Sequence, residues 1–161
     1  MSMRKFMKSL ATLFGVGHFP KGPGTAATVV TIPLVIFLSS LGPLLYMLAI
    51  ILLLPVSIWA CDIYEQEVGG HDHKEIVIDE VLGFLIAMVW LPMTWQAMVL
   101  GFVLFRLLDI TKPLFIGYID KKVQGGLGVM ADDIAAGLVT SVIMQILYTQ
   151  TNWLGSQVLV P

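Results

Sequence analysis

The acidic residues of this chain are concentrated beside some of its most apolar segments. Seven of the eleven carboxylates lie in DIYEQEVGGHDHKEIVIDE, residues 62–80, and the apolar run VLGFLIAMVW follows directly. A carboxylate beside hydrocarbon must lose its charge or find a cation. A solvated loop between two membrane helices accounts for Glu65, Glu67 and Glu75. It does not account for Asp79 and Glu80, for which a divalent metal ion is the first candidate partner.

The composition is that of a membrane protein. Only 12% of the residues are charged, against about 25% in soluble domains, and the mean hydropathy is +0.88. The length of 161 residues predicts a single domain over residues 1–161. The net charge of −2 leaves no basic footprint, so no nucleic acid partner is expected. The single cysteine, Cys61, excludes an intrachain disulfide and a cysteine-rich zinc site.

The apolar segments predict an all-α, multihelical integral membrane protein with short hydrophobic helices and hairpins. Residues 26–40 are apolar but shorter than the roughly 20 residues that span a bilayer. Leu41-Gly42-Pro43 interrupts the pattern, and residues 44–61 are then the best spanning candidate. Together the two segments predict a helical hairpin that starts and ends on the same side of the membrane.

Residues 81–108 allow two interpretations, because Leu91-Pro92 divides an otherwise apolar stretch. The stretch is either one kinked span or two half-length helices that form a hairpin. Basic residues occur before the first hairpin and again after this stretch: Arg4, Lys5, Lys8 and Lys21, then Arg106, Lys112, Lys121 and Lys122. Their positions favour one shared side, and therefore the hairpin.

The N-terminal part of the chain carries two recognisable local patterns. The N-terminal residues predict a short interfacial amphipathic segment, with Arg4, Lys5 and Lys8 near anionic lipid. The loop GVGHFPKGPGT at residues 15–25 predicts a helix capped by Thr25. Its glycines indicate either a plain turn or a set of backbone N–H groups that hold an anion.

The last helix is predicted to begin at Asp132-Asp133, where carboxylates either cap the helix or bind a ligand. Asp79 and Asp133 are each followed four residues later by a glycine, which leaves room beside the carboxylate. Carboxylates therefore gather at the ends of apolar segments, at what could be one membrane face. An oxygen-only set without cysteine pairs or an HExxH motif suits Mg²⁺ rather than zinc.

Basic residues suited to phosphate accompany these carboxylates. Arg106, Asp109 and Lys112 recur every three residues and are predicted to share a helix face. Arg106 could hold a phosphate in a bidentate manner, and Lys112 could supply a point charge. The alternative is a surface Arg106–Asp109 pair with an interfacial lysine.

Four segments carry a family resemblance: FGVGHFPKGPGT, GGHDHKEIVIDEVLG, FRLLDITKP and GGLGVMADDIAAG. They resemble, in the same order, the successive motifs of the phosphatidylglycerophosphatase A family, and they cover most of residues 12–140. The resemblance implies a Mg²⁺-dependent bacterial enzyme that removes the terminal phosphate of phosphatidylglycerophosphate and yields phosphatidylglycerol. It also implies a location in the cytoplasmic (inner) membrane, with the active site facing the cytoplasm.

Carried over position by position, the resemblance implies a set of site residues. The expected metal ligands are Asp79, Glu80, Asp132 and Asp133. The expected phosphate contacts are Arg106, Lys112 and the N–H groups near Gly24 and Thr25. The expected catalytic residues are Asp72, Asp79, Arg106 and Lys112, with Asp109 as a further candidate.

Alternatives remain open at this point. The attacking group is either a water activated by the metal or a carboxylate, Asp72 or Asp79. The substrate could be another lipid or soluble phosphomonoester. A small cation transporter is a non-enzymatic alternative, and it predicts carboxylates near the middle of the membrane on opposed helices.

Overall fold

The fold is all-helical throughout the part of the chain that the computed structural model describes, residues 2–70, 73–113 and 125–155. This agrees with the predicted fold class. The elements in chain order are α1 (Met3–Ala11), the 3₁₀ helix η1 (Leu13–His18), α2 (Pro23–Ser40), α3 (Pro43–Val68), α4 (Ile78–Ala87), α5 (Trp95–Thr111) and α7 (Gly126–Gln150).

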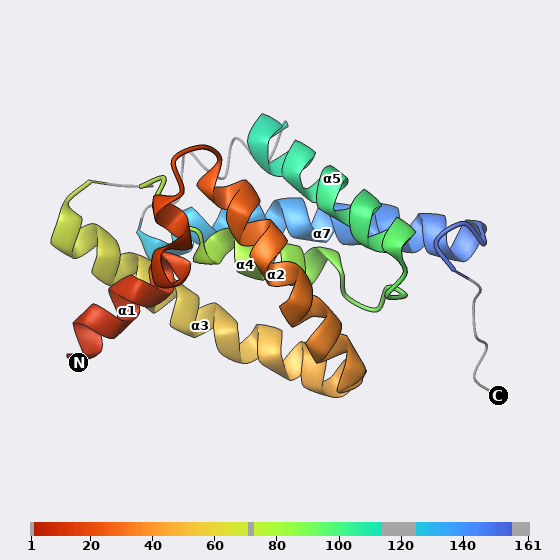
Figure 1. The fold of residues 1–161 in the computed structure, drawn as a ribbon, viewed down its shortest axis with the longest axis horizontal. Coiled ribbons are helices and arrows are strands. Elements are labelled where there is room, and N and C mark those ends of the chain that lie inside the picture. Colours follow the sequence, from red (N-terminus) through yellow and green to blue (C-terminus); the bar gives the residue numbers. More distant parts are fainter. Residues whose placement is uncertain (1, 71–72, 114–124, 156–161) are drawn as a thin grey trace.

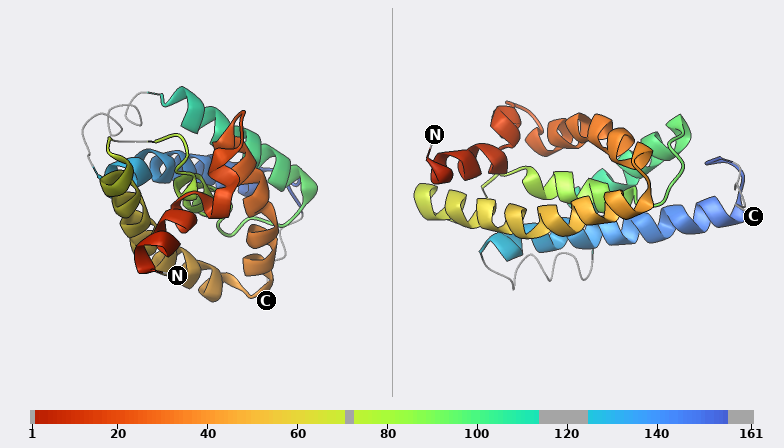
Figure 2. Two further views of the ribbon diagram at one scale, coloured as in Figure 1. Left: turned by 60° about the vertical axis from the view of Figure 1, so that its left-hand side comes forward. Right: turned by 90° about the horizontal axis from the view of Figure 1, so that it is seen from below.

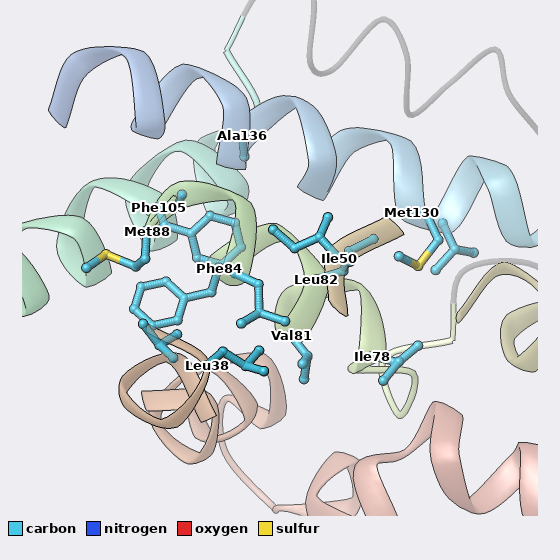
Figure 3. Close-up of a cluster of buried hydrophobic side chains, with 14 of the residues drawn as sticks. Leu38, Ile50, Ile78, Val81, Leu82, Phe84, Met88, Phe105, Met130 and Ala136 are labelled. Carbon is cyan, nitrogen blue, oxygen red and sulfur yellow. The ribbon is translucent and has the colours of Figure 1, made fainter. Parts of the chain in front are cut away.

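The short helix α4 lies at the centre of the molecule, with α2, α3, α5 and α7 packed around it (Figures 1 and 3). After Glu80 its side chains are apolar on every face, and Val81, Leu82, Phe84 and Leu85 are at most 2% exposed. A helix that is apolar all round is stable only when it is enclosed. The apolar run after Glu80 is therefore a buried core helix.

The two ends of α4 are stabilised in different ways. At its C-terminal end, the Tyr46 hydroxyl donates to the Leu85 carbonyl (2.9 Å) and the Gln145 amide donates to the Val89 carbonyl (2.7 Å). These bonds occupy carbonyls that the helix itself cannot pair. The first turn carries Asp79 and Glu80, whose charges the helix dipole favours.

Helices α4 and α7 cross with their backbones in close contact. A Cβ atom at Gly137 would overlap the backbone carbonyl of Gly83, and a Cβ at Gly83 would lie 2.7 Å from the carbonyl oxygen of Asp133. Small residues of this kind let two helix backbones touch. The glycine one turn after each aspartate therefore leaves room beside the carboxylate and also lets the two helix backbones touch. This contact brings α7 against α4 next to Asp79 and Asp133.

The remaining helices form two hairpins. Helices α2 and α3 run in opposite directions around Gly42 (φ 94°), as predicted (Figure 1). Residues 81–108 belong to two separate helices, α4 and α5, which also run in opposite directions (Figure 1). The prediction of two helices is confirmed, and their shared side of the membrane stays a prediction. Among the described residues, α2, α3 and α7 are long and apolar enough to cross a membrane.

These connections place several helix ends together. The N-terminal ends of α2, α4 and α7 and the C-terminal ends of α3 and α5 lie toward one end of the molecule (Figures 1 and 2). Helix α1 packs there against the last turns of α3.

Three predicted boundaries are wrong. Thr25 does not cap α2, because Pro23 starts the helix after Gly22, which adopts a left-handed conformation. Residues 62–68 are not a loop but the last turns of α3, where Glu67 pairs with Lys8. Helix α7 begins at Gly126 rather than at Asp132, so the acidic pair lies in the second turn and cannot be an N-cap.

The hairpins predict a labelling pattern in membranes. Single cysteines placed at the exposed positions Gln66 and Thr111, in a Cys61→Ser background, should react with a membrane-impermeant thiol reagent from the same side. Cysteines at Ser40 and Asn152 should react from the other side. Ser40 is the last residue of α2 and Asn152 follows the end of α7, and both of these helix ends lie at the opposite end of the molecule (Figure 1). Labelling of Gln66 and Thr111 from opposite sides would show that α4 and α5 do not form a hairpin.

Candidate active site

Five carboxylates from three helices converge beside the α4–α7 crossing. Oxygen atoms of Asp79, Glu80 and Asp133 lie within 4.8 Å of one another, and so do those of Asp109, Asp132 and Asp133. Asp133 belongs to both groups and joins them into one cluster. The four aspartates are at most 9% exposed. The cluster therefore lies inside the helical assembly and not on a solvated surface.

Negative charge exceeds positive charge in this cluster. Among the described residues, Arg106 and Lys112 form ion pairs with these five carboxylates. Three buried oxygens of these carboxylates have no hydrogen-bond partner in the described part of the chain: Asp79 Oδ1, Glu80 Oε2 and Asp133 Oδ2. Buried carboxylate oxygens without donors are costly, and a bound cation would satisfy them. The donor set, made of carboxylates alone, fits a hard divalent cation such as Mg²⁺.

The two basic residues hold opposite sides of the cluster. Arg106 Nη1 lies 2.5 Å from Asp109 Oδ2 and 3.6 Å from Glu80 Oε1. Lys112 ends α5 in a left-handed conformation (φ 40°), and its Nζ lies 2.5 Å from Asp132 Oδ2. The Arg106 side chain is only 12% exposed, so the predicted surface pair with Asp109 is instead buried. Both cations are fixed next to the carboxylates that would carry a metal.

The first turn of α2 closes the site on another side. A Cβ at Gly24 would overlap Glu80 Oε1 and lie 3.1 Å from Arg106 Nη1. Only glycine at this position lets the helix N-terminus approach the two side chains this closely. The N-terminus of a helix favours negative charge, because its first N–H groups are unpaired. Gly24 thus lies beside the cluster as predicted, whereas Thr25 lies one residue further along the same turn.

Burial also changes the acidity of the α4 carboxylates. It raises the pKa of Asp79 well above the usual range, and the neighbouring charges of Glu80 and Asp133 raise it further. Burial raises the pKa of Glu80 as well, while Arg106 opposes that shift. A raised pKa in a protein without bound metal marks a site at which negative charge is poorly compensated.

Most of the predicted site residues come together in the structure: Gly24, Asp79, Glu80, Arg106, Asp109, Lys112, Asp132 and Asp133. Asp109 was only a further candidate on sequence grounds, yet it shares a group with Asp132 and Asp133. Asp72 lies outside the described residues, so its predicted catalytic role stays a prediction.

Sequence reasoning missed Asp62. Its Oδ1 accepts a hydrogen bond from the Gly126 N–H (2.6 Å), which caps α7 from the last part of α3. A Cβ at Gly126 would meet the Asp62 carboxylate and the Ile58 carbonyl, so the helix begins where only glycine fits. The one available signal was the lack of any capping side chain before α7, and it does not reveal a partner 64 residues away.

Comparison with known proteins identifies the family. The family model for phosphatidylglycerophosphatase A matches residues 9–148. The chain belongs to this family. It is 39% identical over 136 residues to the phosphatidylglycerophosphatase A of Escherichia coli, covering 84% of this chain and 79% of that protein. It is 36% identical over 137 residues to the Haemophilus influenzae protein of the same name, covering 84% of each.

A relative with another name is also similar. A Bacteroides thetaiotaomicron protein provisionally named a phosphatidylinositol-3-phosphatase is 34% identical over 146 residues, covering 85% of this chain and 90% of that protein. No solved structure matches the chain. The family makes the chain a phosphatase, and its apolar helices make it a membrane-associated protein.

Proposed function

We propose that this member of the phosphatidylglycerophosphatase A family hydrolyses phosphatidylglycerophosphate to phosphatidylglycerol and phosphate with the help of Mg²⁺. We further propose that it does so in the bacterial cytoplasmic membrane, with the site facing the cytoplasm. The observation that carries the proposal is the buried, undercompensated carboxylate cluster with Arg106 and Lys112 beside it. The curated relatives named for this activity support the choice of substrate.

In this proposal, Asp79, Glu80, Asp132 and Asp133 hold the metal, and Asp109 completes the cluster. Bound Mg²⁺ would neutralise charge on the phosphate and orient it for in-line attack. Arg106 would hold phosphate oxygens through its planar guanidinium, and Lys112 would add a second positive charge. The N–H groups near Gly24 would contact the same anion from the start of α2.

The attack breaks the bond between phosphorus and the glycerol oxygen and forms a new bond between phosphorus and oxygen. With water as the attacking group, its proton passes to a carboxylate and from there to the glycerol oxygen that leaves. Asp79 is placed for this role because it is buried within the cluster, beside Glu80 and Asp133. With Asp79 itself as the attacking group, a phosphorylated aspartate forms first and water then releases the phosphate.

The location of the cluster argues against cation transport. A transporter would place carboxylates near the middle of opposed spanning helices. Here Asp79 and Glu80 lie in the first turn of α4, Asp132 and Asp133 lie in the second turn of α7, and Asp109 lies in the last turn of α5. The carboxylates therefore lie near helix ends.

The direct test is phosphate release by the purified chain in detergent micelles. Phosphatidylglycerophosphate should be hydrolysed with Mg²⁺ and not with EDTA. Phosphatidylinositol 3-phosphate and soluble glycerol 3-phosphate should react at least about tenfold more slowly, a difference of roughly 1.4 kcal/mol in transition-state binding. Faster release from phosphatidylinositol 3-phosphate would assign the other lipid substrate. Undiminished release in EDTA would contradict the metal.

Asp→Asn substitutions separate a metal ligand from a structural acceptor, because Asn keeps the shape but lacks the charge. Asp79→Asn, Asp132→Asn and Asp133→Asn should each lower phosphatase activity by on the order of a hundredfold or more. Excess Mg²⁺ should restore part of it in at least one variant. The matched control is Asp62→Asn, which still offers an oxygen to the Gly126 N–H and should stay active. Full activity of the Asp132 and Asp133 variants would disprove the metal site.

A further inference from the structure

A cavity lined by charged and polar side chains lies away from the carboxylate cluster, between α1 and the last turns of α3. Its volume is 350 Å³, and its lining includes Lys5, Lys8, Ser9, Tyr64 and Glu67. Figure 1 shows α1 lying across the C-terminal part of α3. None of these residues belongs to the cluster proposed for catalysis.

The cavity carries more positive than negative charge. Lys5 and Lys8 line the cavity together with one carboxylate, Glu67, whose Oε2 lies 2.9 Å from Lys8 Nζ. The Lys8 ammonium also lies 5.9 Å from the centre of the Tyr64 ring. His18 lines the cavity too and can donate one hydrogen bond when neutral. One lysine is therefore left over to balance a singly charged anion such as a phosphodiester.

The position of the cavity along α3 fits the depth of lipid headgroups. The apolar run of α3 ends at Cys61, and Tyr64 and Glu67 follow three and six residues later. At about 1.5 Å per residue, these side chains extend roughly 5–9 Å beyond the apolar run. The headgroup layer is about 5–7 Å thick on each side of the hydrocarbon. If α3 spans the membrane, Tyr64 therefore falls within this layer and Glu67 lies at its outer edge.

Exposed apolar side chains on α1 and η1 indicate that this segment contacts a membrane rather than water. Phe6, Phe14 and Phe19 are 40%, 65% and 58% exposed. The Phe6 and Phe14 rings meet edge to face, with their centroids 6.2 Å apart. Leu13 and Phe14 both adopt left-handed backbone conformations, which are uncommon for bulky residues. Exposed aromatic residues beside lysines are typical of an interfacial anchor.

We propose that this cavity binds the phosphodiester headgroup of an anionic membrane phospholipid, separately from the catalytic cluster. Lys5 and Lys8 bind the phosphate, while the aromatic side chains of α1 and η1 contact the acyl region. His18 also lines a neighbouring cavity of 240 Å³ with Pro23, the residue before Gly24. The bound lipid thus lies next to the α2 end of the candidate active site. The proposal concerns binding and does not depend on the substrate.

The test measures thermal unfolding of the purified full chain in neutral micelles. Short-chain phosphatidylserine should raise the midpoint of unfolding in a saturable way, because a ligand that binds the folded state stabilises it. Phosphatidylcholine of the same chain length should not do so, because it has no net charge. Glycerophosphoserine, which has the same phosphodiester without acyl chains, should not do so either. An equal shift with either control would overturn an anionic lipid as the occupant.

Variants locate the binding site. Lys5→Gln should weaken phosphatidylserine binding about fivefold, which corresponds to one lost lysine near a lipid surface. It leaves the Lys8–Glu67 pair in place, so folding should not be affected. Glu67→Gln should tighten binding, since it removes the competing negative charge. Lys21→Gln is the matched control, because it changes net charge equally at an exposed position outside the cavity.

Two outcomes of the variant series would overturn the proposal. If Lys21→Gln weakens binding as much as Lys5→Gln, the lipid responds to overall charge and not to the cavity. If Glu67→Gln weakens binding or leaves it unchanged, the anion does not bind beside Lys8.

Discussion

The backbone contact between α4 and α7 at Gly83 and Gly137 is the feature on which the rest of the structure depends. It lets two helices approach so closely that no Cβ fits between them. Because each glycine lies one turn after an aspartate, the contact also sets Asp79 beside Asp133. The packing of α7 against α4 therefore also assembles the candidate site.

This arrangement forces acidic groups together in a membrane-associated protein, and the structure opposes their repulsion in several ways. Arg106 and Lys112 neutralise part of the charge, and the N-terminus of α4 favours Asp79 and Glu80. Asp62 fixes the start of α7, which holds Asp132 and Asp133 in place. The oxygens that have no hydrogen-bond donor are the ones that would coordinate a divalent cation. A site with this imbalance is suited to bind a metal and then a phosphate.

The sequence predicted site residues where carboxylates adjoin an apolar segment. Asp79 and Glu80 stood out because an apolar run follows them, and the paired aspartates at 132 and 133 stood out in a similar way. Contacts between distant residues could not be predicted, because nothing local announces them. The Asp62 cap on Gly126 and the Tyr46 and Gln145 bonds to the end of α4 are of this kind. The start of α7 was misplaced because glycines gave no capping signal.

The central claim is that the α4–α7 contact builds the metal site, and Gly137→Ala tests it most directly. The measurement is Mn²⁺ binding by electron paramagnetic resonance, with Gly101→Ala as control, since a Cβ there meets the flexible side chains of Met88 and Met144 and no backbone atom. Helical content should be retained in both variants. The account predicts that Gly137→Ala weakens Mn²⁺ binding on the order of tenfold or more, as disturbed support of metal ligands does, while Gly101→Ala binds like the unaltered chain. Unchanged Mn²⁺ affinity in Gly137→Ala would contradict the account.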